Sequence, residues 1–162
     1  MRKLILIRHA SAEPERYPLK DFDRQLDTEG NTTAKSLGRF FRDKGLIPEM
    51  ILHSAARRTT QTAELIANEW NMERHQIRSE LPLYNASHQI LLERLKNIQD
   101  EIQFLALVGH NPGISQIATL LSRQNLYQLH PGAGLCMELS LPNWAGLKTG
   151  TGLEKAYFPA QL

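Results

Sequence analysis

Short continuous runs of apolar residues alternate along the chain with longer segments in which apolar residues recur every three or four positions. Residues 4–7, 50–52 and 104–108 are continuous apolar runs. Such runs are typical of parallel strands, which are covered on both faces and need not alternate. Residues 135–141 and 155–158 alternate better between apolar and polar positions, so we expect them to be strands nearer an edge of the sheet.

The longer segments have the spacing of helices that bury one face. The first predicted helix covers residues 32–44 and ends at Gly45. Ser54 and Ser87 are good N-cap residues for the second and third helices, and the fourth is expected at residues 114–121. The side chains predicted to face the core are Ala63, Ile66, Ala67 and Trp70 in the second helix and Ile90, Leu91, Leu95 and Ile98 in the third. Repeated alternation of strand and helix predicts an α/β fold, a three-layer α/β/α sandwich with a mostly parallel central sheet.

Length and composition indicate a single domain over residues 1–162. A chain of this length buries roughly 70% of the surface that its unfolded form exposes, so it needs no disulfide or structural metal to fold. Charged residues make up 22% and hydrophobic residues 41%, which excludes general disorder. The formal net charge of +2 argues against nucleic acid as the main partner, whereas the pI of 8.8 leaves room for a local basic pocket.

Cys136 is the one cysteine, so the chain forms neither an intrachain disulfide nor a cysteine-based zinc site. Its apolar neighbours predict a buried thiol rather than a nucleophile. No segment approaches the ~18 consecutive apolar residues of a membrane-spanning helix. The apolar run at residues 4–7 is too short for a signal peptide. We therefore expect a cytoplasmic protein without a membrane or nucleic-acid partner.

Basic and imidazole side chains follow the three buried strands. They are Arg8 and His9 after the first strand, Ser54, Arg57 and Arg58 after the second, and His110 after the third. Ligands of open α/β sheets bind beyond the carboxyl ends of the strands, so we expect these residues to converge. Guanidinium groups donate in pairs to phosphate oxygens, and a helix N-terminus adds positive charge. The set therefore suits a tetrahedral oxyanion. The other histidines, His53, His75, His88 and His130, lack the spacing of metal ligands and are expected to be structural or exposed.

Three of these segments resemble the histidine phosphatase superfamily, the phosphoglycerate-mutase-like enzymes. Arg8-His9-Ala10 resembles its Arg-His-Gly signature. Residues 54–63 resemble its Ser-Pro-x-x-Arg-Ala-x-Gln-Thr-Ala segment, which places the second arginine at Arg58. Residues 108–113 are similar to its second-histidine loop. The short length narrows the resemblance to the SixA-type phosphohistidine phosphatases.

Further matches extend the resemblance over nearly the whole chain. They lie at residues 23–30, 83–86, 131–133 and 144–153. The departures from the family pattern are Ala10 for glycine, Ala55 for proline, Thr59 for alanine, and Gln25 and Asp27 for proline and threonine. None of these removes a nucleophile or a phosphate ligand.

The resemblance implies a two-step reaction at four catalytic residues. His9 attacks phosphorus, and Arg8, Arg58 and His110 bind the phosphoryl oxygens. Arg24 assists at the rim as a further phosphate-binding residue. A phospho-His9 intermediate then reacts with water. No metal or cofactor is implied, because the arginines supply the positive charge.

Larger members of the superfamily also carry a carboxylate that protonates the leaving oxygen. Glu13 and Glu80 are the nearest candidates here, and neither matches well. An alkoxide needs such an acid, whereas the imidazole of phosphohistidine can leave neutral. The absence of an acid therefore favours a phosphohistidine substrate.

The leading expectation is a phosphatase acting on phosphohistidine in a signalling protein, such as a histidine phosphotransfer domain or a phosphotransferase-system carrier. One alternative is a phosphomonoesterase for a small metabolite such as a sugar phosphate or nucleotide, which a carboxylic acid in the site would favour. Another is a phosphate-binding module without turnover, against which the intact His9 argues.

Overall fold

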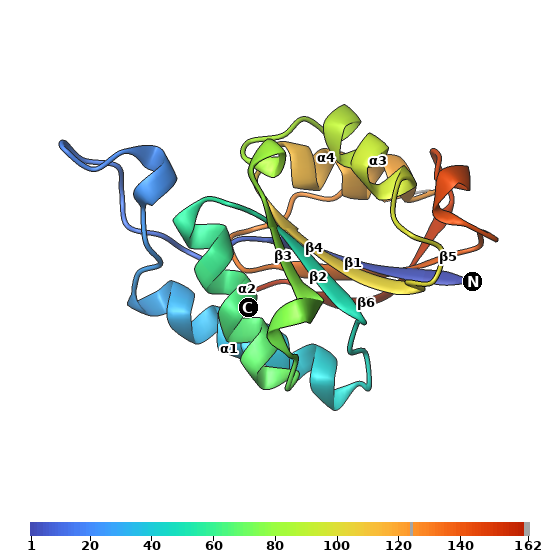
Figure 1. Ribbon diagram of the computed structural model, residues 1–162, viewed down its shortest axis with the longest axis horizontal. Coiled ribbons are helices and arrows are strands. Elements are labelled where there is room, and N and C mark those ends of the chain that lie inside the picture. The colour runs from blue at the N-terminus through green and yellow to red at the C-terminus, as the bar shows by residue number, and fades with distance from the viewer. Residues whose placement is uncertain (124, 161–162) are drawn as a thin grey trace.

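A six-stranded sheet in the order β3-β2-β4-β1-β5-β6 forms the middle layer of the computed structural model, which describes residues 1–123 and 125–160 (Figure 1). The strands are β1 (Arg2–Arg8), β2 (Met50–Ser54), β3 (Ile77–Glu80), β4 (Phe104–Gly109), β5 (Gly134–Leu139) and β6 (Gly152–Phe158). Strands β3, β2, β4 and β1 are parallel, and β5 is antiparallel to both of its neighbours. The expected mostly parallel sheet is confirmed.

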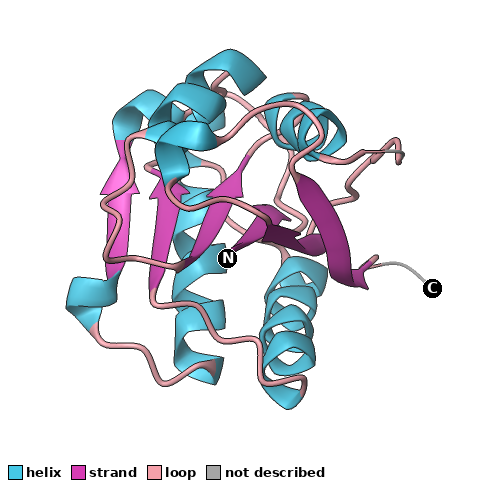
Figure 2. Ribbon diagram, turned by 90° about the vertical axis from the view of Figure 1, so that its right-hand side faces the viewer, coloured by secondary structure: helices cyan, strands magenta, loops and turns pink. Residues whose placement is uncertain are grey.

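Two helices cover each face of this sheet (Figures 1 and 2). They are α1 (Thr28–Asp43) and α2 (Arg57–Glu69) on one side and α3 (His88–Lys96) and α4 (Gly113–Leu121) on the other. Short 3₁₀ turns lie at Asp21–Asp23 (η1), Arg74–Gln76 (η2), Leu81–Leu83 (η3) and Trp144–Gly146 (η4). None of the helices in residues 1–123 and 125–160 is long and apolar enough to cross a membrane.

Strand β1 shows why its apolar run is continuous. Leu4 and Leu6 pack with the α3 and α4 side chains, whereas Ile5 and Ile7 pack with those of α1 and α2. All four side chains are fully buried. Alternate residues of a strand point to opposite faces, so a strand between two helical layers must be apolar throughout.

The helices differ from the sequence predictions at two boundaries and in the burial of one side chain. Helix α1 begins at Thr28 rather than residue 32, because the Asp27 side chain accepts a hydrogen bond from the Gly30 N–H and caps it. Ser54 is not the N-cap of α2; Ala56 occupies that position, and Ser54 is the last residue of β2. Ile90 is 49% exposed rather than buried. The predicted cap at Ser87 is confirmed by its bond from the Ile90 N–H.

One edge strand of the sheet was missed by the sequence prediction, and the strands near the other edge were predicted. The edge strand β3 was not predicted, since its sequence Ile-Arg-Ser-Glu is half exposed and contains no apolar run. The two late strands lie toward one edge of the sheet, as predicted: β6 is the edge strand, and β5 pairs with β1 on one side and β6 on the other. Cys136 and Trp70 are buried, as predicted, and Trp144 is buried as well.

Candidate active site

The side chains of His9, Arg58 and His110 meet at the carboxyl ends of β1, β2 and β4. Arg58 Nε donates to His9 Nε2 at 3.3 Å, and Arg58 Nη2 lies 3.3 Å from His110 Nδ1. The two imidazole rings are 5.3 Å apart, centre to centre. The sheet brings them together because Arg8 at the end of β1 pairs with Gly109 at the end of β4.

The backbone around His9 fixes which ring nitrogen faces the site. His9 Nδ1 lies 2.8 Å from the carbonyl oxygen of Ala10. A carbonyl only accepts, so Nδ1 carries the proton and Nε2 keeps a lone pair. The Gly132 N–H donates to the carbonyls of Arg8 and His9. Gly132 has φ +83°, and a Cβ there would lie 2.5 Å from Thr33, so this position requires glycine.

Ser54 orients the second imidazole. His110 Nε2 and Ser54 Oγ are 2.7 Å apart. Arg58 can only donate, so His110 Nδ1 accepts from it and His110 Nε2–H donates to Ser54. The serine predicted as a helix cap therefore acts on the site instead.

Both imidazoles are neutral at physiological pH. Burial, with the charges of Arg58 and the other arginines, lowers the pKa of His9 to about 4. Burial lowers the pKa of His110 to about 3, with further contributions from His9 and Arg58. A neutral imidazole with a free lone pair is the form in which histidine acts as a nucleophile.

Positive charge accumulates around the rings. Burial and the nearby Arg58 lower the pKa of Arg8. Arg8 Nη1 donates to the carbonyl of Leu129, while its Nε is buried and has no hydrogen-bond partner in the described residues. The first turn of α2, which carries Arg58, contains no acidic residue. Clustered cations, an unused donor and a helix N-terminus together favour an oxyanion.

Asp21 is a carboxylate of the site that the sequence did not reveal. Its Oδ2 accepts from Arg58 Nη2 at 3.1 Å and from the Tyr84 hydroxyl, and its Oδ1 accepts from Arg24 Nη1 at 2.9 Å. Its backbone carbonyl accepts from Arg58 Nη1 at 2.7 Å. Burial alone would raise the pKa of Asp21, but the Tyr84 and Arg24 hydrogen bonds and the Arg58 charge lower it to about 2.

Arg24 therefore lies at the edge of the site, held from two sides. Besides Asp21, its Nε donates to the backbone carbonyl of Glu13 at 2.7 Å. The charge of Arg24 also contributes to the lowered pKa of His9. The i, i+3 spacing of Asp21 and Arg24 was the only sequence signal for this ion pair.

The contacts of the two candidate general acids, Glu80 and Glu13, do not suit proton donation. Glu80 forms a two-pronged ion pair with Arg94 at 2.7 and 2.8 Å, and this pair lowers the pKa of Glu80. A carboxylate held ionised in this way is a poor proton donor. Glu13 contributes its backbone carbonyl to Arg24.

Within residues 1–123 and 125–160, no group of three or more His, Cys, Asp or Glu side chains is placed to hold an ion. Of the remaining histidines, His53 is buried, His88 is half-buried, and His75 and His130 are exposed.

Comparison with known proteins identifies the family. A model of the histidine phosphatase superfamily (branch 1) matches residues 4–82. An uncharacterised protein of Mycobacterium leprae (strain TN) is 30% identical over 119 residues, which cover 72% of this chain and 71% of that protein. The chain belongs to the histidine phosphatase superfamily. An uncharacterised chloroplastic protein of Arabidopsis thaliana is 32% identical over 130 residues, which cover 75% of this chain but 59% of the plant protein.

The chain has the fold of the SixA proteins. The SixA protein of Nakamurella multipartitia superposes with a TM-score of 0.81 at 24% identity, over 97% of this chain and 95% of the other. The protein histidine phosphatase SixA in complex with tungstate gives 0.82 at 16% identity, over 98% and 97%. A mycobacterial glucosyl-3-phosphoglycerate phosphatase gives 0.68 at 13% identity, over 96% and 97%. The predicted phosphoglycerate-mutase-like α/β fold is thus confirmed.

Proposed function

We propose that this protein is a metal-independent phosphatase that removes phosphate from phosphohistidine through a phospho-His9 intermediate. The observation that carries the proposal is the contact between Arg58 Nε and His9 Nε2 at 3.3 Å, with His9 Nδ1 bonded to Ala10. The lone pair that attacks phosphorus and the guanidinium that binds the phosphoryl oxygens are therefore directed at the same position in the site.

In the first step, His9 Nε2 forms a bond to phosphorus as the P–N bond of the substrate breaks. The bonding pair passes to the substrate imidazole, which leaves neutral because its other nitrogen already carries a proton. Arg8, Arg58 and His110 donate to the phosphoryl oxygens and stabilise their charge. The donor from His110 requires its ring to turn from Ser54, or to take up a proton on Nδ1.

In the second step, water attacks phosphorus and the P–Nε2 bond breaks. The bonding pair returns to His9, and the protons of the water remain on the released phosphate. His9 regains its starting tautomer, since Nδ1–H stays bonded to Ala10 throughout. Neither step needs a carboxylic acid, a metal or a cofactor.

The ionisation of Asp21 supports phosphohistidine over a phosphomonoester. Three donors hold the Asp21 carboxylate, and its pKa of about 2 leaves no proton to give at neutral pH. An alkoxide leaving group gains strongly from such a proton, whereas a neutral imidazole does not. A phosphohistidine-bearing phosphotransfer domain or carrier in a cytoplasmic signalling pathway fits this chemistry.

A phosphomonoesterase acting on a small metabolite is the second candidate. The presence of Asp21 within the site favours this second candidate. A substrate that displaces Arg58 or Tyr84 would raise the pKa of Asp21, and the carboxyl group could then donate a proton. The likeness in fold to the glucosyl-3-phosphoglycerate phosphatase agrees with this candidate. A binding module without turnover is the third candidate, which the unprotonated Nε2 of His9, directed at the same position as Arg58, disfavours.

The test measures phosphate release in the presence of EDTA from a phosphohistidine-bearing carrier protein and from a panel of sugar phosphates and nucleotides. The proposal predicts fast, His9-dependent release from phosphohistidine and slow release from monoesters. Preferential release from a monoester would establish the second candidate. Phosphate binding without release from any substrate would establish the third.

A further inference from the structure

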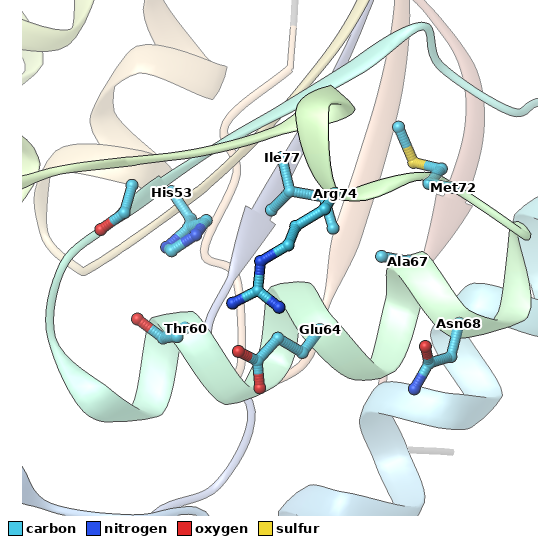
Figure 3. A pocket seen from close by; sticks show the side chains of 9 residues that line it. His53, Thr60, Glu64, Ala67, Asn68, Met72, Arg74 and Ile77 are labelled. Atoms are coloured by element: carbon cyan, nitrogen blue, oxygen red, sulfur yellow. The ribbon is translucent and has the colours of Figure 1, made fainter.

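A cavity lies between α2 and the η2–β3 segment (Figure 3). Its volume is about 510 Å³, within the range of small-molecule sites. Its lining includes the polar side chains of His53, Thr60, Glu64, Asn68, Arg74 and Ser79 and the apolar ones of Ala67, Met72 and Ile77. None of the residues proposed for phosphoryl transfer lines it.

His53 presents an unused acceptor to this cavity. The side chain is 3% exposed, and its Nδ1 lies 2.8 Å from the carbonyl oxygen of Ser54. This repeats the arrangement of His9 with Ala10, so Nδ1 carries the proton and Nε2 a lone pair. Nε2 makes no hydrogen bond to any part of the chain that the structure describes. Burial lowers the pKa of His53, which keeps the ring neutral and accepting.

Glu64 and Arg74 supply opposite charges at the mouth of the cavity. Figure 3 shows the Arg74 guanidinium reaching from η2 toward the Glu64 carboxylate on α2. Within the described ranges, neither side chain forms an ion pair within 4.0 Å. A carboxylate, a guanidinium and an imidazole lone pair around one space are complementary to a ligand with both N–H donors and an anionic group.

We propose that this cavity binds a small zwitterion of the α-amino-acid type. The ammonium group donates to Glu64 and to His53 Nε2. The carboxylate accepts two hydrogen bonds from Arg74. An apolar side chain of the ligand lies against Ala67, Met72 and Ile77.

The binding test uses three matched probes: L-methionine, its amide, which lacks the carboxylate, and N-acetyl-L-methionine, which lacks the ammonium. Isothermal titration of the full chain should show saturable binding of L-methionine. Each derivative should bind at least about tenfold more weakly, because each loses one charged partner. Equal binding of all three probes, or no saturable binding of L-methionine in the millimolar range, would overturn the proposal.

Substitutions locate the site. Glu64→Gln and Arg74→Gln change exposed positions, and each should lower the affinity for L-methionine at least about tenfold. Arg78→Gln is the matched control, since Arg78 is an exposed arginine of β3 that lines a different cavity. The control should bind L-methionine unchanged. Equal affinity in all three variants would contradict the assignment.

A nitrogen-15 NMR spectrum of the histidine rings tests the role of His53 without a substitution in the core. Saturation with L-methionine should shift the Nε2 resonance of His53, because that lone pair gains a donor. An unchanged His53 resonance at saturation would contradict the site. The cavity and the phosphoryl-transfer residues do not overlap, so either proposal can fail without the other.

Discussion

Arg58 Nε donates a hydrogen bond to Nε2 of His9 at 3.3 Å, while both terminal nitrogens of the same guanidinium contact Asp21. One rigid, planar group thus joins the nucleophilic nitrogen to a loop carboxylate. A phosphoryl group that enters the site takes over donors that Arg58 now directs at His9 and Asp21. The position of Arg58, and hence the alignment of the attack, depends on Asp21.

His9→Ala should abolish phosphate release and leave the fold intact. His9 supplies the nucleophile, and its removal leaves Arg8, Arg58 and His110 to bind anions. We expect a loss of at least about 10³-fold in kcat, as for other residues of a nucleophilic centre. Phosphate release, circular dichroism and vanadate binding measure the three properties. An unfolded variant would instead identify His9 as a structural residue.

Asp21→Asn should lower kcat/KM by about 10- to 100-fold. The change removes the charge that holds Arg58 and Arg24, and hydrogen bonds to a charged group contribute about 1.5–3 kcal/mol each. The bond from Arg58 Nη1 to the Asp21 backbone remains, so the loop should keep its place. Steady-state kinetics on the phosphohistidine carrier measure the loss.

Tyr84→Phe is the control for that experiment. It removes one neutral donor to Asp21 and keeps the ring, which packs edge-on against His110 at 5.5 Å between centres. We expect a smaller loss than for Asp21→Asn. A Phe variant as impaired as the Asn variant would contradict the positioning role of the carboxylate and assign the effect to the tyrosine hydroxyl.

Acid should destabilise the protein in the range set by its buried histidines. His9 and His110 have pKa values of about 4 and 3, below the 6.5 of a free imidazole. Between pH 6.5 and these values the unfolded chain binds protons that the native protein does not, so stability falls as pH falls. Asp21, with a pKa of about 2, extends the loss below pH 3.8.

Urea denaturation at a series of pH values, with NMR titration of both rings, measures this dependence. The His9 ring should remain neutral down to about pH 4. The nucleophile is then available throughout the neutral range, so His9 should impose no loss of activity between pH 8 and 6. Titration of His9 near 6.5, or flat stability from pH 6.5 to 4, would contradict the account.

The convergence of His9, Arg58 and His110 could be predicted from the sequence, because these residues follow buried strands that have a strong apolar pattern. Asp21 and Tyr84 were missed as a pair, since their contact depends on the course of irregular loops, which leave no periodicity in the sequence. Ser54 was misread because serine suits both a helix cap and a hydrogen bond to histidine. Half-exposed segments and loop contacts were therefore the unpredictable part.

Glu80→Gln tests whether that residue acts as a general acid. Its ion pair with Arg94 is partly exposed, so we expect a stability loss within about 1 kcal/mol and no change in kcat on phosphohistidine or on monoesters. Glu13→Gln is a parallel control with the same expectation, because the contact of Glu13 with Arg24 runs through its backbone. A selective loss of monoester hydrolysis in either variant would identify the proton donor.

Transfer of the phosphoryl group to His9 can be followed in a quenched-flow experiment. A carrier labelled with radioactive phosphate on histidine is mixed with the protein and quenched in alkali within the first turnover. An acid-labile, alkali-stable label is expected on the peptide that contains His9, and none on the His9→Ala variant. Label on another residue, or full turnover by His9→Ala, would rule out His9 as the nucleophile.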